Sequence, residues 1–384
     1  MNEDVSINQN LSSVKIIHLV RSIEVSSMIW NELYFHSRLR IFGVLYPPVV
    51  VHFFGRTEIN DTPHVKDGFK KYFSTSFFRV LCLLSKLVRR RRYDEQMIIH
   101  VHNPVLAPIA VLTKWVNSRV SIVANLHSDW KYMRFHQKLC LYLLAYTSSY
   151  FITVSTAIQE NIPKNVKDSL EKRNALIAIP NGIPTINVLN GIKSRADDQL
   201  PVVKREGAIV VARMVPAKNC LFIFDLLKQS NVIERLEWYG DGPMRKEIEK
   251  KIIDEGLEQK VLLRGTQPRS VVYKAMMRSS LYISASNWEG LGVANLEAIA
   301  FGSYPLMSNI PAHNEIAKKI CHFTLDTDKP DEWIKAIHDF CALNDEQKMK
   351  LRQKFSNTVK RYYDIDSMIH SYINVYQRIA NNKL

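Results

Sequence analysis

The segment Leu281-Tyr-Ile-Ser-Ala-Ser-Asn-Trp-Glu289-Gly-Leu-Gly292 decides how the rest of the chain is interpreted. It begins as a short apolar strand and passes into a loop with two glycines. An apolar helical pattern follows at Val293, Leu296 and Ala300. Strand–loop–helix units of this kind build parallel sheets, whose ligands bind beyond the carboxyl ends of the strands. Glycines let the backbone approach a ligand, and a helix start presents N–H groups that suit a phosphate. We therefore expect a ligand site at this turn.

The same alternation of short apolar runs and helical patterns continues along the whole chain. The strands expected are residues 15–20, 49–53, 97–101, 120–125 and 151–154 in a first series, and 208–212, 236–239, 261–263, 281–284 and 304–307 in a second. Helical patterns separate them, for example at 104–116, 219–227, 243–253 and 293–301, and the chain is helical from Pro330 onward. This pattern predicts an α/β fold with two Rossmann-like domains and a cleft between them.

The domain boundary is expected within residues 187–206, where Asn, Gly, Ser, Asp and Pro cluster and apolar periodicity fades. We predict an N-terminal domain of residues 1–186, completed by residues 365–384 of the C-terminal helices. Residues 187–364 would then form the second domain.

The composition is that of an ordinary globular protein, with 46% hydrophobic and 23% charged residues among 384. No apolar run reaches the roughly 18–20 residues of a membrane-spanning helix, and the polar start at residues 1–13 is not a secretory signal. Five scattered cysteines without a C-x-x-C pair favour a reducing cytoplasm. The net charge is +15, and residues 1–200 hold 25 basic and 15 acidic side chains, a surplus of +10. Such a surface attracts phosphates, but no recognition motif points to nucleic acid.

Two predicted strand ends carry polar residues. Arg213 and Lys218 follow strand 208–212, and two fixed cations before a helix start near Asn219 would suit a diphosphate. Glu289 and Glu297, eight residues apart, could accept hydrogen bonds from two sugar rings. A structural alternative stays open, in which Glu289 caps the helix, Glu297 lies on the surface and the cations are solvated.

A third strand end, Tyr239-Gly-Asp-Gly-Pro243, is expected to be structural. Its glycines fit a tight turn and Pro243 fits the first position of a helix.

Together these segments resemble glycosyltransferase family 4, whose members are retaining enzymes with the GT-B fold. The matching motifs occur in the family's order: A-R-x4-K at Arg213 and Lys218, G-D-G-P at 240–243, E-G-L-G-x4-E at 289–297, A-x-G at 300–302, and the stretch 310–315. The resemblance is close over residues 175–320 and looser in the N-terminal half. It implies a GT-B architecture for the two predicted domains.

The resemblance also implies roles for individual residues. Arg213 and Lys218 would bind the donor diphosphate and stabilise the leaving group. Glu289 would hold the hydroxyls of the donor sugar, and Glu297 would accept hydrogen bonds from the ribose. His127, at the end of the strand 120–125, would contact the sugar from the N-terminal domain. The donor-binding backbone would comprise Gly290, Leu291, Gly292 and Val293. No metal or other cofactor is expected, because cations and a helix end would take the place of a D-x-D-type metal motif.

The expected activity is transfer of a hexose-type sugar from a UDP- or GDP-linked donor to a saccharide or lipid-linked acceptor. The setting implied is lipopolysaccharide, O-antigen or capsule synthesis. Two alternatives stay open: a GT-B sugar-nucleotide epimerase, and a non-catalytic GT-B scaffold or sugar-binding partner. The loop at residues 18–27 has no glycine where many relatives have several, and Arg21 could replace backbone contacts there. This departure leaves the identity of the acceptor undetermined, whereas the prediction of donor binding does not depend on it.

The segment from Phe69 to Arg92 is apolar, aromatic and strongly basic. As a helix it would either lie on an anionic membrane surface or pack on the N-terminal domain. The first possibility predicts a cytoplasmic protein bound peripherally to the inner face of the cell membrane.

Overall fold

The structure is a computed structural model that describes residues 14–20, 49–52, 70–73, 82, 84, 96–183, 205–230 and 232–381. The chain divides into two compact units. Unit 1 comprises Met1–Gly182 and Ile365–Leu384, and unit 2 comprises Ile183–Asp364. Residues 184–204, which include most of the segment where the boundary was expected, lie outside the described residues, as does the loop from Arg21 to Ser27.

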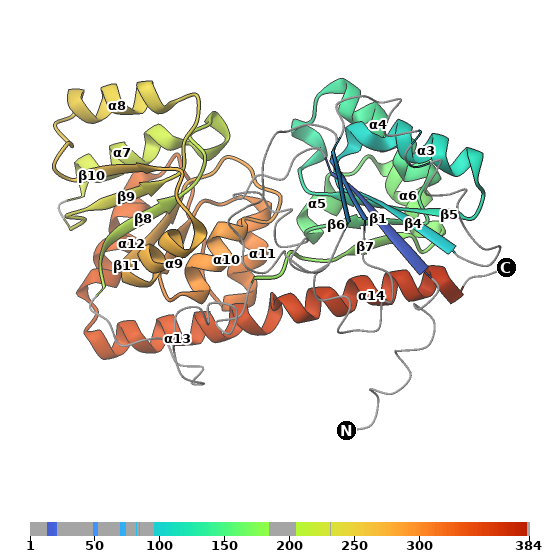
Figure 1. The fold of residues 1–384 in the computed structure, drawn as a ribbon. Coiled ribbons are helices and arrows are strands. Elements are labelled where there is room, and N and C mark those ends of the chain that lie inside the picture. The colour runs from blue at the N-terminus through green and yellow to red at the C-terminus, as the bar shows by residue number, and fades with distance from the viewer. Residues whose placement is uncertain are drawn as a thin grey trace. The chain divides into compact units, whose positions relative to one another are not determined.

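Unit 1 contains, in its described part, a sheet of seven parallel strands in the order β3-β2-β1-β4-β5-β6-β7 (Figure 1). The strands are β1 (Val14–Val20), β2 (Val49–His52), β3 (Lys70–Phe73), β4 (Gln96–Val101), β5 (Val120–Leu126), β6 (Tyr150–Thr153) and β7 (Leu176–Ala178). β4 is buried from Met97 to Val101 without alternation, because helices cover both faces of a parallel sheet. The first predicted series of strands is confirmed, and β3 and β7 are additional.

The helix expected across residues 69–92 is wrong at its start. Lys70–Phe73 is extended and pairs in parallel with β2, with Lys71 opposite Val50. An edge strand can form here because the backbone N–H and C=O groups of this apolar and basic run hydrogen-bond to the neighbouring strand. Cys82 and Leu84 are helical, and the other residues between 74 and 95 lie outside the described part of the chain.

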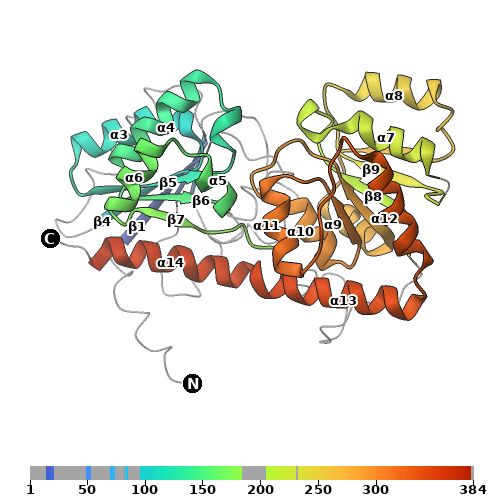
Figure 2. The same ribbon diagram turned by 180° about the vertical axis from the view of Figure 1, so that it is seen from behind.

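Helices cover the two faces of this sheet from different parts of the chain. α3 (Ala107–Val116) and α4 (Phe135–Thr147) lie on one face, and α14 (Ile365–Asn381) lies along the other, as Figures 1 and 2 show. α5 (Thr156–Glu160) and α6 (Lys164–Lys172) precede β7. α14 packs its apolar stripe on the strands in a core cluster with Ile98, Val123 and Ile152. The C-terminal helix thus completes the N-terminal core.

Unit 2 contains a second parallel sheet, in the order β10-β9-β8-β11-β12. Its strands are β8 (Glu206–Val211), β9 (Leu236–Tyr239), β10 (Val261–Gly265), β11 (Ser279–Ser284) and β12 (Tyr304–Met307). Its helices are α7 (Cys220–Gln229), α8 (Arg245–Asp254), α9 (Arg269–Arg278), α10 (Val293–Ala300), α11 (Pro311–Ile320), α12 (Pro330–Ala342) and α13 (Asp345–Tyr362). The second predicted series of strands is confirmed. Within the described ranges, no helix is long and apolar enough to cross a bilayer.

Because α14 packs on the sheet of unit 1, truncating a buried side chain of this helix should destabilise the protein measurably. Ile369 is fully buried in the cluster beneath α14, so Ile369→Ala should lower the free energy of unfolding by about 2–5 kcal/mol. The measurement is urea unfolding of the full-length protein. Asn374→Ala, at an exposed position of the same helix, is the matched control and should change stability by less than ~0.5 kcal/mol. Equal effects of the two substitutions would contradict the docking.

Candidate functional site

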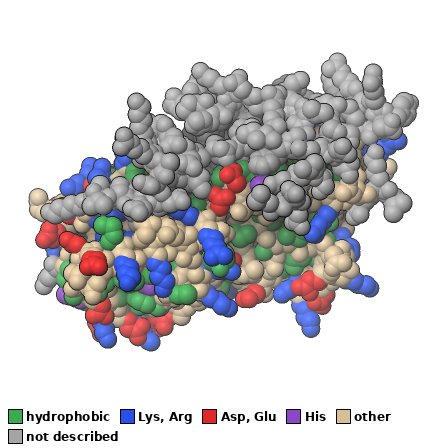
Figure 3. All heavy atoms as spheres, turned by 90° about the horizontal axis from the view of Figure 1, so that it is seen from below, with side chains coloured by type: hydrophobic (Ala, Val, Ile, Leu, Met, Phe, Trp, Pro, Cys, Tyr) green, Lys and Arg blue, Asp and Glu red, His purple; other side chains and the backbone are tan. Residues whose placement is uncertain are grey.

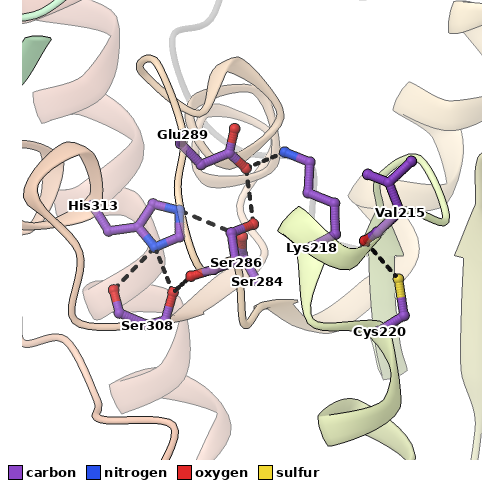
Figure 4. Close-up of polar contacts among 8 residues, drawn as sticks. All are labelled: Val215, Lys218, Cys220, Ser284, Ser286, Glu289, Ser308 and His313. Carbon is purple, nitrogen blue, oxygen red and sulfur yellow. Dashed lines mark hydrogen bonds and ion pairs between the residues drawn. The ribbon is translucent and has the colours of Figure 1, made fainter. Parts of the chain in front are cut away.

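The loop that follows β11 places Glu289 against Lys218 of the loop that follows β8. The Lys218 ammonium donates a hydrogen bond to Glu289 Oε1, and Ser286 Oγ donates to the same oxygen at 2.9 Å (Figure 4). The Glu289 side chain is only 13% exposed. Its other oxygen, Oε2, accepts no hydrogen bond from the described residues. One carboxylate oxygen is therefore held in place while the other stays open.

The backbone around Lys218 is tied to the Glu289 loop. Lys218 ends a short 3₁₀ turn, Pro216–Lys218, after which Asn219 adopts a left-handed conformation and α7 begins. The Asn287 N–H donates to the Ala217 carbonyl at 2.8 Å, and the Asn287 side chain donates to Pro216 O at 3.1 Å. These bonds fix the two loops to each other, so the ion pair does not depend on flexible side chains alone.

The charge of Glu289 is stabilised in place. Burial alone would raise the pKa of this carboxyl, because a charge is costly away from water. The positive charge of Lys218 and the hydrogen bonds from Lys218 and Ser286 outweigh burial, and they hold the pKa of Glu289 below its usual value. Glu289 is therefore ionised at neutral pH and acts only as an acceptor.

A buried histidine lies behind this pair and was not among the predicted site residues. His313, on α11, is fully buried, with Nδ1 3.0 Å from the Ser308 carbonyl and Nε2 3.5 Å from Ser284 Oγ. A carbonyl only accepts, so Nδ1 carries the proton. Burial is the main reason why the pKa of His313 falls to about 4. The ring is thus neutral. Its sequence signal was the stretch 310–315, which the resemblance includes without giving a role to this histidine.

The start of α10 lies beside Glu289 and has unused donors. Gly292 is the N-cap residue, with φ of 82°, and no side chain caps the helix. A Cβ at Gly292 would come within 2.6 Å of Asn295 Nδ2, so both the conformation and the space require glycine. The N–H groups of Val293 and Ala294 donate to no acceptor within the described chain, and Asn295 Nδ2 is buried without one. The capping role considered for Glu289 is wrong.

Gly290, Leu291, Gly292 and Val293 are buried next to this helix start, and their contact with a donor stays a prediction.

Glu297 lies one turn further along α10 and is 6% exposed. Its Oε1 accepts a hydrogen bond from Tyr273 OH at 2.9 Å and lies 3.6 Å from an Arg269 nitrogen. Its Oε2 accepts no hydrogen bond from the described residues. The surface position considered for Glu297 is wrong, because the side chain is buried and partnered. It repeats the arrangement at Glu289, in which one oxygen is fixed and the other is open.

Arg213 is placed differently from Lys218. It follows β8 in the same loop, but its side chain is exposed and forms no ion pair with the described residues. The structure brings Lys218 and Glu289 together and leaves Arg213 free to reach a ligand from solvent.

The loop after β9 supports the Arg213 segment. Met214 N–H donates to the Asp241 carbonyl at 3.0 Å, and Met244 N–H donates to the Met214 carbonyl at 3.2 Å. The structural interpretation of this loop thus fits its contacts. The predicted helix start at Pro243 is wrong by two residues, because α8 begins at Arg245 and Pro243 lies in the preceding turn.

His127, the candidate in unit 1, follows β5 and adjoins a row of buried histidines. His102 stacks on it with ring centroids 6.0 Å apart, and His100 stacks on His102 at 4.1 Å. His18 Nδ1 lies 2.9 Å from His102 Nε2, and His100 Nδ1 lies 2.7 Å from Tyr376 OH of α14. Burial, reinforced by the neighbouring histidines, lowers the pKa of His100 well below its usual value. His100 is therefore neutral, and it stacks on His102, which lies within hydrogen-bond distance of His18.

Within the described residues, the trio His18, His100 and His102 is the group whose ligand atoms come close enough for a metal, all within 4.8 Å of one another. It belongs to unit 1. The site around Glu289 in unit 2 brings together a lysine, a glutamate and serines, which offer a metal a single carboxylate.

Residues 193–362 match the family model described as "Glycosyl transferases group 1". The structure resembles that of the Anabaena protein HepE, solved with UDP and glucose, with a TM-score of 0.76, 17% identity, and coverage of 95% of this chain and 99% of that one. The fold is GT-B. A second GT-B neighbour is TarM of S. aureus, with a TM-score of 0.69, 13% identity, and coverage of 94% of this chain and 99% of that one.

Two curated relatives are also named as glycosyltransferases. The chain is 22% identical over 303 residues to an Escherichia coli enzyme named UDP-Gal:alpha-D-GlcNAc-diphosphoundecaprenol alpha-1,3-galactosyltransferase, covering 72% of this chain and 76% of the relative. It is 30% identical over 137 residues to the Bacillus subtilis protein named putative glycosyltransferase EpsF, covering 34% of this chain and 35% of that protein. Together with the matched domain, these relatives support a GT-B glycosyltransferase.

The neutral state of His313 predicts a pH dependence of stability. The unfolded chain binds a proton near pH 6.5, whereas the folded ring resists protonation until about pH 4. The unfolded state then holds more protons in this window, so stability falls as pH falls through it, by about 3 kcal/mol in all. His313→Gln should remove that part of the slope in urea unfolding followed by tryptophan fluorescence. The same pH slope in wild type and variant would contradict the assignment.

Proposed function

We propose that the protein is a retaining glycosyltransferase of family 4 that uses a UDP- or GDP-linked hexose. The acceptor is a saccharide that is lipid-linked or part of a lipopolysaccharide, in the synthesis of a surface glycan. UDP is the favoured carrier, since the E. coli relative is named for UDP-Gal and the Anabaena structure was solved with UDP. The name of the E. coli relative also supports a lipid-linked acceptor.

The observation that carries this proposal is the Lys218–Glu289 pair beside the start of α10. It combines a cation, free backbone N–H groups and an ionised carboxylate with one open oxygen. A nucleotide sugar needs these complements, since its diphosphate is anionic and its sugar hydroxyls donate hydrogen bonds. Glu297, with its own open oxygen one turn away, is positioned to accept from a ribose hydroxyl.

In the proposed reaction the bond between the anomeric carbon and the diphosphate oxygen breaks. The acceptor hydroxyl attacks the same face, and its proton passes to the departing phosphate. Negative charge builds up on the diphosphate, and Lys218, Arg213 and the α10 N–H groups stabilise it, which is the largest catalytic contribution expected. Glu289 orients the sugar, and His127 is proposed to contact it from unit 1. No metal is required, because these groups supply the positive charge.

We further propose that the protein works peripherally on the cytoplasmic face of the membrane, where a lipid-linked acceptor would be found. The segment Phe69–Arg92, on which this expectation was based, is described only at residues 70–73, 82 and 84.

A donor screen tests the proposal. UDP-glucose, UDP-galactose, UDP-N-acetylglucosamine and GDP-mannose are compared for thermal stabilisation and for hydrolysis, with and without EDTA. The expected result is one preferred donor, slow hydrolysis insensitive to EDTA, and release of a sugar whose anomeric configuration is retained. Inversion of the donor at a ring carbon without transfer would favour an epimerase, and binding without turnover would favour a non-catalytic partner.

Lys218 is expected to act on the transition state. Lys218→Ala should lower the rate of transfer or hydrolysis by about 10²–10³-fold, the usual loss when one stabilising donor is removed. The matched control is Lys250→Ala, at an exposed position of α8 in the same unit, which should keep wild-type turnover. If Lys218→Ala keeps near wild-type turnover with unchanged folding, Lys218 is not part of the mechanism.

Glu297 is expected to act on binding instead, because the ribose lies away from the bond that breaks. Glu297→Gln should raise the donor KM about tenfold and change kcat little, since a contact of equal strength in ground and transition states is lost. Tyr273→Phe, which removes the hydrogen bond that fixes Glu297, should give a smaller shift in the same direction. A fall in kcat with constant KM would assign Glu297 to the chemical step.

A further inference from the structure

Helix α4 of unit 1 is apolar on two opposite sides. Leu141, Leu144 and Ala145 are buried against the unit. The outward side carries Phe135, Leu139, Leu143 and Tyr146, which are 83%, 62%, 36% and 53% exposed. Their spacing of four, four and three residues aligns them in one stripe. A helix that covers a soluble domain normally has a polar outer side, so this stripe needs a separate explanation.

The stripe continues onto neighbouring elements. Trp115, at the end of α3, is 80% exposed, and Tyr132, one turn before α4, is 45% exposed. Lys114 Nζ donates to the Thr147 carbonyl at 2.7 Å, which joins the ends of α3 and α4, and Trp115 and Tyr146 are the chain neighbours of these two residues. We call Trp115, Tyr132, Phe135, Leu139, Leu143 and Tyr146 the α3–α4 apolar face.

The segment that carries this face holds few acids, and α6, which packs against α4, adds three lysines together with Asp168 and Glu171. Between residues 114 and 147 the chain carries five basic side chains, Lys114, Arg119, Lys131, Arg134 and Lys138. The one acid in that stretch, Asp129, is buried and accepts hydrogen bonds from Asn161 and the Lys131 N–H. On the face that Figure 3 shows, acidic and basic side chains are interspersed. The α3–α4 apolar face is thus an aromatic and aliphatic surface with a cationic rim.

We propose that the α3–α4 apolar face docks on an anionic lipid bilayer, with its aromatic and leucine side chains at the boundary between headgroups and acyl chains. Aromatic rings with a polar edge, leucines and a cationic rim are the composition that binds this boundary. A second copy of the chain fits less well, because a symmetric contact would bring the cationic rims of the two copies together.

This inference rests on the proposed function only for the role given to docking, which is to hold the enzyme where a lipid-linked acceptor lies. The docking itself is argued from exposure and charge. It also moves the expected membrane contact from the segment 69–92 to described residues of α3 and α4.

Co-sedimentation of the full-length protein with lipid vesicles tests the docking. Vesicles of equal parts phosphatidylglycerol and phosphatidylcholine are compared with vesicles of phosphatidylcholine alone. The wild type should prefer the anionic vesicles. The double variant Phe135→Ser/Leu139→Ser should partition on the order of a hundredfold less, since each of the two apolar side chains contributes about tenfold or more. The double variant Arg134→Gln/Lys138→Gln should partition roughly thirtyfold less, because each cation near an anionic leaflet contributes about fivefold.

Matched controls come from unit 2. Ile253→Ser/Val271→Ser removes two exposed apolar side chains, 64% and 40% exposed, far from α4 in sequence, and Lys246→Gln/Lys250→Gln removes two cations of α8. Both should bind vesicles like the wild type. Thermal unfolding of every variant checks that the fold is kept. A wild type indifferent to phosphatidylglycerol, or a Phe135→Ser/Leu139→Ser variant that binds like its control, overturns the proposal.

A spectroscopic measurement separates contact from co-precipitation. Lipids brominated in the acyl chain should quench tryptophan fluorescence on binding, and Trp115→Phe should remove much of that quenching while vesicle binding persists. If light scattering shows that Phe135→Ser/Leu139→Ser abolishes a dimer and leaves vesicle binding unchanged, the face is an interface between copies and the proposal is wrong. Donor hydrolysis in solution should be the same in this variant as in the wild type, so docking and glycosyl transfer can fail separately.

Discussion

The site in unit 2 depends on how closely the backbones of neighbouring loops can approach at the carboxyl edge of the sheet. Gly240 has φ of 128°, and a Cβ there would lie 2.1 Å from the Ala212 carbonyl, while a Cβ at Gly242 would lie 2.4 Å from the Met214 carbonyl. No other residue fits either position without moving the loop after β8. That loop is held on its other side by Asn287, so Lys218 is presented to Glu289 from a backbone clamped between two neighbours.

Electrostatics then explains why the Lys218–Glu289 pair can bind a ligand and contributes little to the stability of the fold. A buried ion pair gives little net stability when both partners are fully satisfied, because desolvation offsets the attraction. Here Ser286 and Lys218 share one oxygen of Glu289, and the second oxygen has no partner among the described residues. Behind them His313 stays neutral, so it adds no charge that would compete with Lys218. A sugar hydroxyl can therefore meet an ionised, oriented acceptor without first breaking an internal bond.

Sequence reasoning could predict the parts of this structure that depend on local pattern. Long apolar runs such as Met97–Val101 predicted buried strands, and the glycine loop at 289–292 predicted the turn before α10. β7 was missed because three residues, Leu176–Ala178, carry no period, and β3 was assigned to a helix because Lys-Lys-Tyr-Phe fits either element. Tyr273 was missed because its partner Glu297 lies 24 residues further along the chain, and His313 was missed because the stretch 310–315 was noted without a role for its histidine.

The histidine row shows why the chain has to return to unit 1 at its end. His18 and His100 are directly paired on β1 and β4, and Asn125 follows on β5, so three strands point polar side chains at one covering helix. An apolar helix there would leave buried nitrogens without partners, a cost of about 1–3 kcal/mol for each group. α14 instead brings Tyr376 to His100 and Tyr372 to Asn125, both at 2.7 Å, between isoleucines that complete the core. The same helix therefore closes the hydrophobic core and gives hydrogen-bond partners to His100 and Asn125. His102 stacks on both His100 and His127, so these buried polar residues lie next to the side chain that we propose contacts the donor sugar.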